Sequence, residues 1–176
     1  MLERLSRRIA LEIKKADPEG PGSVDVLTYI IAIKFNWYSG LILTLLFGWI
    51  LSDVLNALLA FFSFVVLRKY SGGLHFKSLT VCAVFSAALF ASIPLIPLGH
   101  DGTLLLTSIT ALVVLCVAPN NFEDINPSKI DPYLKWISLT IVLTNFVIQS
   151  PVIALSFTAQ AILLLPLPNL KGGERA

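Results

Sequence analysis

Long apolar runs alternate with short polar breaks along this chain, and the pattern predicts helices that span a membrane. After Ser23, the breaks divide the chain into six apolar segments, at residues 24–51, 54–67, 79–98, 103–118, 133–148 and 152–167. A transmembrane helix needs about 20 apolar residues, and several of these segments are shorter. We therefore predict an all-α membrane protein with about six transmembrane helices, in which local thinning of the bilayer or a re-entrant segment accommodates the short ones.

The first 22 residues are richer in charge than the rest of the chain. Their apolar residues recur at helical spacing among arginines and lysines: Leu2, Leu5, Ile9 and Ile13. This spacing predicts an amphipathic helix on the membrane surface with its cations toward anionic headgroups. A helix packed on the protein's own cytoplasmic face fits the spacing equally well. Prolines and glycines at residues 17–22 should end the helix, and Ser23 is a suitable N-cap for the next one.

Composition agrees with a membrane protein. The chain is 56% hydrophobic and 14% charged, whereas soluble domains carry about 25% charged residues. Its 176 residues suit a single membrane domain over residues 1–176, with an amphipathic helix and linker at 1–22, a helical bundle at 23–168 and a cytoplasmic tail at 169–176. The two cysteines lie in different apolar runs, which does not predict a disulfide framework.

The distribution of cations predicts the orientation in the membrane. With six spans and a cytoplasmic N-terminus, the inner segments are residues 1–23, 68–78, 119–132 and the tail. All 13 lysines and arginines fall in these segments or near inner helix ends, as the positive-inside rule requires. We therefore expect both termini and the 68–78 segment to face the cytoplasm, where thiols stay reduced.

One polar break, RKYSGGLHFKSLTVC at residues 68–82, holds the candidate chemistry. It places His75 seven residues before Cys82, and a thiol becomes a strong nucleophile when an imidazole and positive potential lie nearby. Cys82 should lie near the start of a helix, where the helix dipole favours a thiolate. Seven helical residues separate Cα atoms by about 10.5 Å, so His75 must lie on a loop that folds back, and Gly72 and Gly73 supply the bend.

Other interpretations fit the same residues. The segment containing His75 could be an ordinary cytoplasmic loop, we expect Cys116 to be a small packing residue, and His100 is expected to be a turn residue. A small transporter or exporter without covalent catalysis is an alternative function, and a non-enzymatic scaffold is a third. Polar residues in the late segments could line a transport path, although such residues more often bond between helices: Thr140, Thr144, Asn145 and Gln160.

The order Arg68, Gly72–Gly73, one residue, His75, six residues and Cys82 resembles the signature of the accessory gene regulator B (AgrB) family. Members are bacterial membrane cysteine endopeptidases that process quorum-sensing peptide precursors. The resemblance covers nearly the whole chain, including the basic amphipathic start, Ala118-Pro119 before a polar loop, and the LLLPLPN ending. The loop PNNFEDINPSKIDPY departs from the family pattern, because it is acidic where relatives tend to carry several cations.

The resemblance implies a mechanism. Cys82 would be the nucleophile that cleaves the C-terminal tail from a short AgrD-like precursor peptide through an acyl-thioester, and His75 would be the general base and acid. The acyl group would then pass to a side chain of the substrate, which closes a thiolactone or lactone ring. Arg68 and Gly73 would support activity.

Further expectations follow from the resemblance. The protein would lie in the bacterial cell membrane with its active site toward the cytoplasm, and it would form a homodimer. No cofactor, metal or nucleic acid is expected. Three cations are candidates for binding an acidic precursor: Lys69, Lys77 and Lys129.

Overall fold

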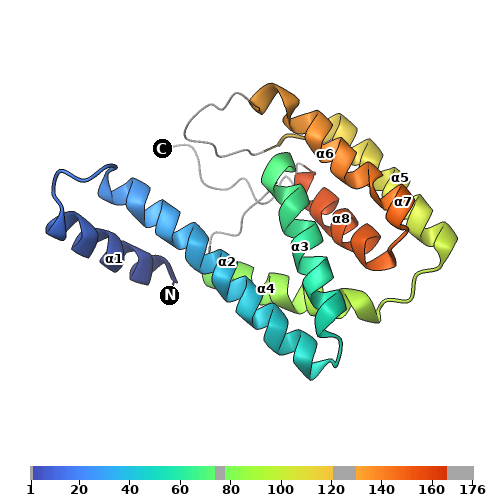
Figure 1. The fold of residues 1–176 in the computed structure, drawn as a ribbon, viewed down its shortest axis with the longest axis horizontal. Coiled ribbons are helices and arrows are strands. Elements are labelled where there is room, and N and C mark those ends of the chain that lie inside the picture. The colour runs from blue at the N-terminus through green and yellow to red at the C-terminus, as the bar shows by residue number, and fades with distance from the viewer. Residues whose placement is uncertain (1, 74–77, 121–129, 166–176) are drawn as a thin grey trace. The chain divides into compact units, whose positions relative to one another are not determined.

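The structure is a computed structural model that describes residues 2–73, 78–120 and 130–165. These residues form helices joined by short turns, and no strand occurs among them (Figure 1). In chain order the elements are α1 (Leu2–Ala16), α2 (Val24–Ile50), α3 (Val54–Ser71), α4 (Leu79–Ser92), η1 (Ile93–Leu95), α5 (His100–Val117), η2 (Asp131–Tyr133), α6 (Leu134–Leu143), α7 (Asn145–Ile148) and α8 (Pro151–Leu164). Together with the apolar composition, this confirms the predicted all-α membrane fold.

Helix length separates the apolar helices into two groups. Within the described ranges, α2, α3 and α5 are long and apolar enough to cross a membrane. The 27 residues of α2 rise by about 40 Å at 1.5 Å per residue, whereas the 14 residues of α8 rise by only about 21 Å. The predicted segment 133–148 is divided into α6 and α7 at Thr144. The number of spans therefore stays a prediction.

Polar caps explain where several helices begin. Ser23 accepts a hydrogen bond from the backbone N–H of Val26 at 3.3 Å, which confirms its predicted role as N-cap of α2. Ser150 caps α8 in the same way through the N–H of Ile153 at 3.4 Å. The hydroxyl or carboxylate of such a residue satisfies an N–H group that has no partner within the helix.

The described helices belong to two compact units. The first contains Met1–Phe61 and His75–Leu95, and in it both α1 and α4 pack on α2 (Figure 1). Small residues allow close approach, since a Cβ on Gly48 would lie 2.9 Å from the Cβ of Ala57. That the chain forms a single domain stays a prediction.

Helix α1 packs through a narrow face of small side chains. Ser6 and Ala10 are fully buried, whereas Leu5 and Ile13 remain 47% and 44% exposed. The apolar stripe of α1 is thus only partly covered by the first unit. This arrangement leaves apolar surface on α1 that suits the predicted position at a membrane interface.

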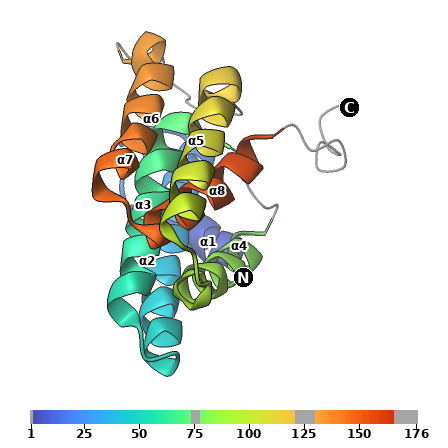
Figure 2. The same cartoon turned by 90° about the vertical axis from the view of Figure 1, so that its right-hand side faces the viewer.

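The second unit contains Phe62–Leu74 and Ile96–Ala176. Within it α5 packs against α6 and α8 (Figure 2), and a hydrogen bond of 3.1 Å joins the hydroxyls of Thr110 and Thr158. Its core is a cluster of buried apolar side chains: Leu67, Val114, Ala118, Val142, Ile153, Phe157 and Leu164. Because Leu67 belongs to this core, the last turns of α3 are anchored in the second unit.

Candidate functional site

Cys82 lies in the first turn of α4, as the sequence predicted. The helix begins at Leu79, and the hydroxyl of Ser78 caps it by accepting from the N–H of Val81 at 3.5 Å. The N–H of Cys82 donates to the carbonyl of Ser78 at 3.0 Å, which closes the first helical turn. The half-buried thiol therefore lies at the positive end of the helix dipole.

A carboxylate from α1 binds the start of the same helix. Oε1 of Glu3 accepts a hydrogen bond from the N–H of Leu79 at 2.7 Å. Hydrogen bonds from the backbone N–H of Glu3 itself and from that of Leu79 lower the pKa of Glu3 from its usual 4.5 to about 2. Glu3 is consequently ionised at neutral pH and ties α1 to the helix that carries Cys82.

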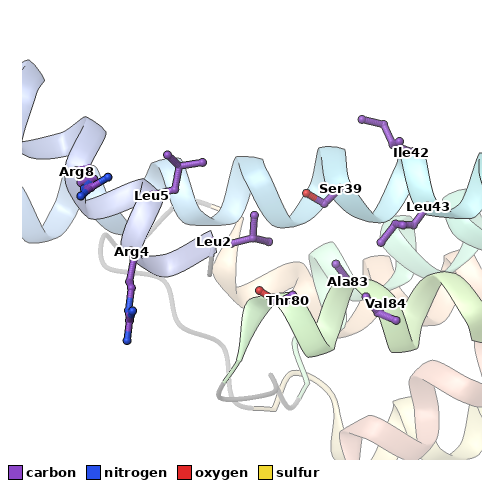
Figure 3. A pocket seen from close by; sticks show the side chains of 10 residues that line it. All are labelled: Leu2, Arg4, Leu5, Arg8, Ser39, Ile42, Leu43, Thr80, Ala83 and Val84. Atoms are coloured by element: carbon purple, nitrogen blue, oxygen red, sulfur yellow. The ribbon is translucent and has the colours of Figure 1, made fainter.

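A cavity of about 920 Å³ lies beside α1, α2 and α4. Figure 3 shows the side chains around it, which are mainly apolar but include Arg4 and Arg8. Helix α4 contributes Thr80, Ala83 and Val84. Since successive residues turn by about 100° around a helix, these three share one face and Cys82 lies on nearly the opposite one. The cavity is therefore not the place where a substrate would meet the thiol.

Arg68 lies on the last turn of α3 rather than in the loop that the sequence predicted. The helix continues to Ser71, since cations are favourable at a helix C-terminus. One guanidinium nitrogen of Arg68 donates to Oε1 of Gln160 at 3.2 Å, and the guanidinium lies 5.7 Å from the centre of the Phe64 ring. Arg68 is thus a half-buried, oriented side chain.

Gly72 and Gly73 form the turn that follows α3. Their φ angles are +73° and +124°, conformations that residues with a side chain rarely adopt. The predicted return of the chain toward Cys82 lies outside the described residues and stays a prediction. The N–H of Gly73 donates to the carbonyl of Asn120 at 2.8 Å. A Cβ on Gly73 would lie 3.1 Å from Nε2 of Gln160, so the turn packs closely against α8.

Three predicted site residues, His75, Lys77 and Lys129, lie outside the described residues. Lys69 is exposed on α3, with its ammonium 5.4 Å from the centre of the Tyr70 ring. Cys82 belongs to the first unit, whereas Arg68 and Gly73 belong to the second. The predicted roles of all these residues stay predictions.

Two minor expectations were wrong. Cys116 is exposed on α5, so it does not pack inside the second unit. His100 is the first residue of α5 rather than a turn residue. The helix begins there because Gly99 has an extended conformation and its carbonyl accepts the N–H of Thr103 at 2.9 Å.

The sequence did not identify Gln160 and Asn120 as residues of the site. Gln160 is fully buried in α8 and bonds to the 68–73 segment. Asn120, the third residue after α5, bonds to the same segment. A glutamine within an apolar run does signal an interhelical hydrogen bond, but nothing in one sequence shows its partner. Within the described ranges, no group of three His, Cys, Asp or Glu residues is placed to hold a metal ion.

The fold and the composition define an all-helical integral membrane protein, with a thiol at the start of one apolar helix. A family model for accessory gene regulator B matches residues 3–166. The chain therefore belongs to the AgrB family.

A relative from Halalkalibacterium halodurans, named as an AgrB-like protein, is 28% identical over 120 residues. The match covers 68% of this chain and 61% of that protein, so the chain spans less than two thirds of the relative's length. No solved structure matches the chain.

Proposed function

We propose that this protein is a membrane cysteine endopeptidase that processes a short, AgrD-like precursor of a quorum-sensing peptide. Membership of the accessory gene regulator B family supports the quorum-sensing role. The observation that carries the catalytic proposal is the position of Cys82 in the first turn of α4, at the positive end of the helix dipole. The site faces the cytoplasm of a bacterial cell, on the reducing side of the membrane.

In the first step, His75 takes the thiol proton and the thiolate of Cys82 attacks the carbonyl carbon of the scissile peptide bond. The tetrahedral intermediate collapses when the C–N bond breaks, and the imidazolium gives its proton to the leaving amine. The C-terminal tail of the precursor departs with a free amino terminus. The rest of the precursor stays bound to Cys82 as an acyl-thioester.

In the second step, a thiol or hydroxyl of the bound peptide attacks the thioester carbonyl. Its proton passes to His75 and then to the departing sulfur of Cys82, so the thiol form of the enzyme is restored. The product is a thiolactone or lactone ring, and no oxidant or reductant is consumed. Thioester exchange retains an activated acyl bond, which allows ring closure without another energy source.

The remaining candidate residues act on the geometry and the charge of the site. Arg68, held by Gln160 at 3.2 Å, orients the site or the acidic part of the precursor, and Gly73 makes the turn before His75. The cations proposed to attract an acidic precursor are Lys69, Lys77 and Lys129. A homodimer in the lipid bilayer is part of the same proposal.

Replacing the two cysteines separately tests the proposal. Cys82→Ala should abolish cleavage of a co-expressed precursor, whereas Cys116→Ser, which alters the exposed cysteine on α5, should keep it. Mass spectrometry of the peptide reads the cleavage. A thioester adduct on the wild-type protein that hydroxylamine releases would identify the intermediate. Cleavage by Cys82→Ala at the wild-type rate would refute the peptidase and favour a transporter or scaffold.

A further inference from the structure

The cavity beside α1, α2 and α4 is charged at one end and mainly apolar at the other. Figure 3 shows Arg4 and Arg8 at the first end, and Ile42, Leu43 and Val84 at the second. Its volume of about 920 Å³ falls in the range of about 300–1,000 Å³ that is usual for pockets that bury a small ligand. All the residues shown to line it belong to the first unit. The cavity therefore matches an amphiphile with an anionic head and an apolar tail.

The two arginines at the charged end lack an anionic partner within the described part of the chain. Arg4 and Arg8 are exposed and lie four positions apart on α1, so they share one face of that helix. Neither guanidinium has a hydrogen bond or ion pair with a described residue, and none of the described residues that line the cavity is acidic. Like charges at this spacing destabilise a helix, and Arg4 also lies near the positive end of the helix dipole. An anionic group that binds both side chains would relieve these effects.

The position of the cavity along α2 indicates its depth in the bilayer. Lys34 and the exposed Trp37 and Tyr38 precede the cavity, and such a combination of a cation and aromatic residues is typical of the membrane–water interface. Residues 39–50 contain no charged side chain, and every residue that α2 contributes to the cavity lies within them. The cavity should therefore begin at the level of the headgroups and extend into the hydrocarbon.

We propose that this cavity binds an anionic phospholipid, with the phosphate on Arg4 and Arg8 and an acyl chain against Ile42, Leu43 and Val84. Basic pockets between transmembrane helices are a known form of lipid recognition. Free phosphate would leave the apolar end empty, and a zwitterionic lipid would bring a cation to the two arginines. At the depth of the apolar end the surroundings are lipid rather than water, which favours a lipid over a peptide. Binding of this lipid does not depend on the proposed peptidase activity.

A photoreactive lipid can locate the binding site in full-length protein reconstituted into phosphatidylcholine nanodiscs. The probe is phosphatidylglycerol with a diazirine in one acyl chain, and mass spectrometry maps the labelled peptides. Labelling should concentrate on residues 39–43 and 80–84, and added phosphatidylglycerol without the diazirine should displace the probe. Phosphatidylcholine with the same diazirine should label these peptides about tenfold less, because its headgroup has no net negative charge.

Two double variants of α1 separate the cavity from the general charge of the helix. Arg4→Gln with Arg8→Gln removes the cations of the cavity and should weaken binding of the probe by about 10- to 30-fold, since each cation near an anionic headgroup contributes a factor of about five. Arg7→Gln with Lys15→Gln removes the same charge from exposed residues of α1 that are not among those lining the cavity. Binding to this control should stay within about threefold of the wild type.

Two variants of α4 test the apolar end. Val84 lines the cavity and is 46% exposed, whereas Val81 is 54% exposed and is not among the lining residues. Val84→Trp should fill part of the cavity and reduce labelling, and Val81→Trp should leave labelling unchanged. Because Arg4 and Arg8 are exposed, the charge variants decide the test if Val84→Trp fails to fold.

Four results would overturn the proposal. Two of them are equal labelling by the two lipid probes and an equal loss of binding in the two double variants of α1. Inorganic phosphate that displaces the probe as well as phosphatidylglycerol does would reduce the cavity to a simple anion site. An acidic amphipathic peptide that displaces the probe, where phosphatidylglycerol does not, would assign the cavity to a peptide instead.

Discussion

Replacing Gly73 by alanine tests whether the turn after α3 needs its backbone geometry. The φ angle of +124° is sparsely populated by residues with a Cβ, and such conformations cost about 1–3 kcal/mol. The new Cβ would also lie 3.1 Å from Nε2 of Gln160 and 3.4 Å from the carbonyl oxygen of Leu163. The backbone must therefore shift, which strains the 2.8 Å bond between Gly73 and Asn120.

The strain at residue 73 should appear either as a slower cleavage rate or as a lower free energy of unfolding. If the turn is displaced while the unit stays folded, the cleavage rate should fall by about 5- to 150-fold, the equivalent of 1–3 kcal/mol. If the turn is retained, the free energy of unfolding should fall by that amount instead. Precursor cleavage in proteoliposomes gives the first quantity, and denaturant unfolding of the second unit gives the other.

Three further variants control for the added methyl group and for the value of φ. Gly40→Ala adds a Cβ at an ordinary contact distance, 3.6 Å from the Phe61 ring, and should change neither quantity appreciably. Gly72→Asn should be tolerated better than Gly73→Asn, because φ of +73° is close to the left-handed region that asparagine enters. Wild-type cleavage and stability in Gly73→Ala would refute the argument.

Two further predictions concern the first unit and the topology. The pKa of Glu3 is lowered to about 2, first by the hydrogen bond from its own backbone N–H and in smaller part by that from Leu79. The ionised carboxylate therefore stabilises the fold above pH 4.5, the usual pKa, and loses this contribution as the pH falls toward 2. Hydrogen exchange in the first turn of α4 should follow this loss, and Glu3→Gln should remove the dependence. The second prediction follows from six spans with both ends inside. In a cysteine-free background, a cysteine at Asp53 should react with an impermeant thiol reagent from outside, and a cysteine at Lys135 only from inside. The reverse pattern would refute the topology.

The start of α2 was predictable because capping is a local interaction. Ser23 caps α2 with a side chain three residues from its partner Val26, so the sequence shows both groups together. The end of α3 was misjudged for a reason that is also local. Arg68 and Lys69 look like a break in an apolar run, but cations stabilise the last turn of a helix, and α3 continues through them to Ser71.

The bonds that organise the 68–73 segment were beyond prediction from one sequence. Arg68 and Gln160 are separated by 92 positions, and their pairing depends on how α8 packs in the second unit. The division between α6 and α7 was hidden for a similar reason. The amide of Asn145 binds the nearby backbone of Ser150 but also Thr107 in α5, 38 positions away, and this second bond depends on tertiary packing.

Three of the four polar residues that suggested a transport path make side-chain hydrogen bonds within the protein. Gln160 and Asn145 are fully buried and hydrogen-bonded. Thr140 and Thr144 are exposed, and the hydroxyl of Thr144 donates to the carbonyl of Ile141 at 2.6 Å. A transport path for a polar solute would need polar side chains from several helices to line one common cavity. Their arrangement instead fits hydrogen bonding between and within helices.

Two turns of the second unit, at Gly72–Gly73 and at Gln149, are each held by a buried side-chain amide. Gln160 holds the turn at Gly72 and Gly73, and Asn145 holds the turn where Gln149 has a φ of +55°. Each uses a buried amide to satisfy backbone groups in a conformation with positive φ. The turn at Gln149 only joins α7 to α8, whereas the other leads to His75.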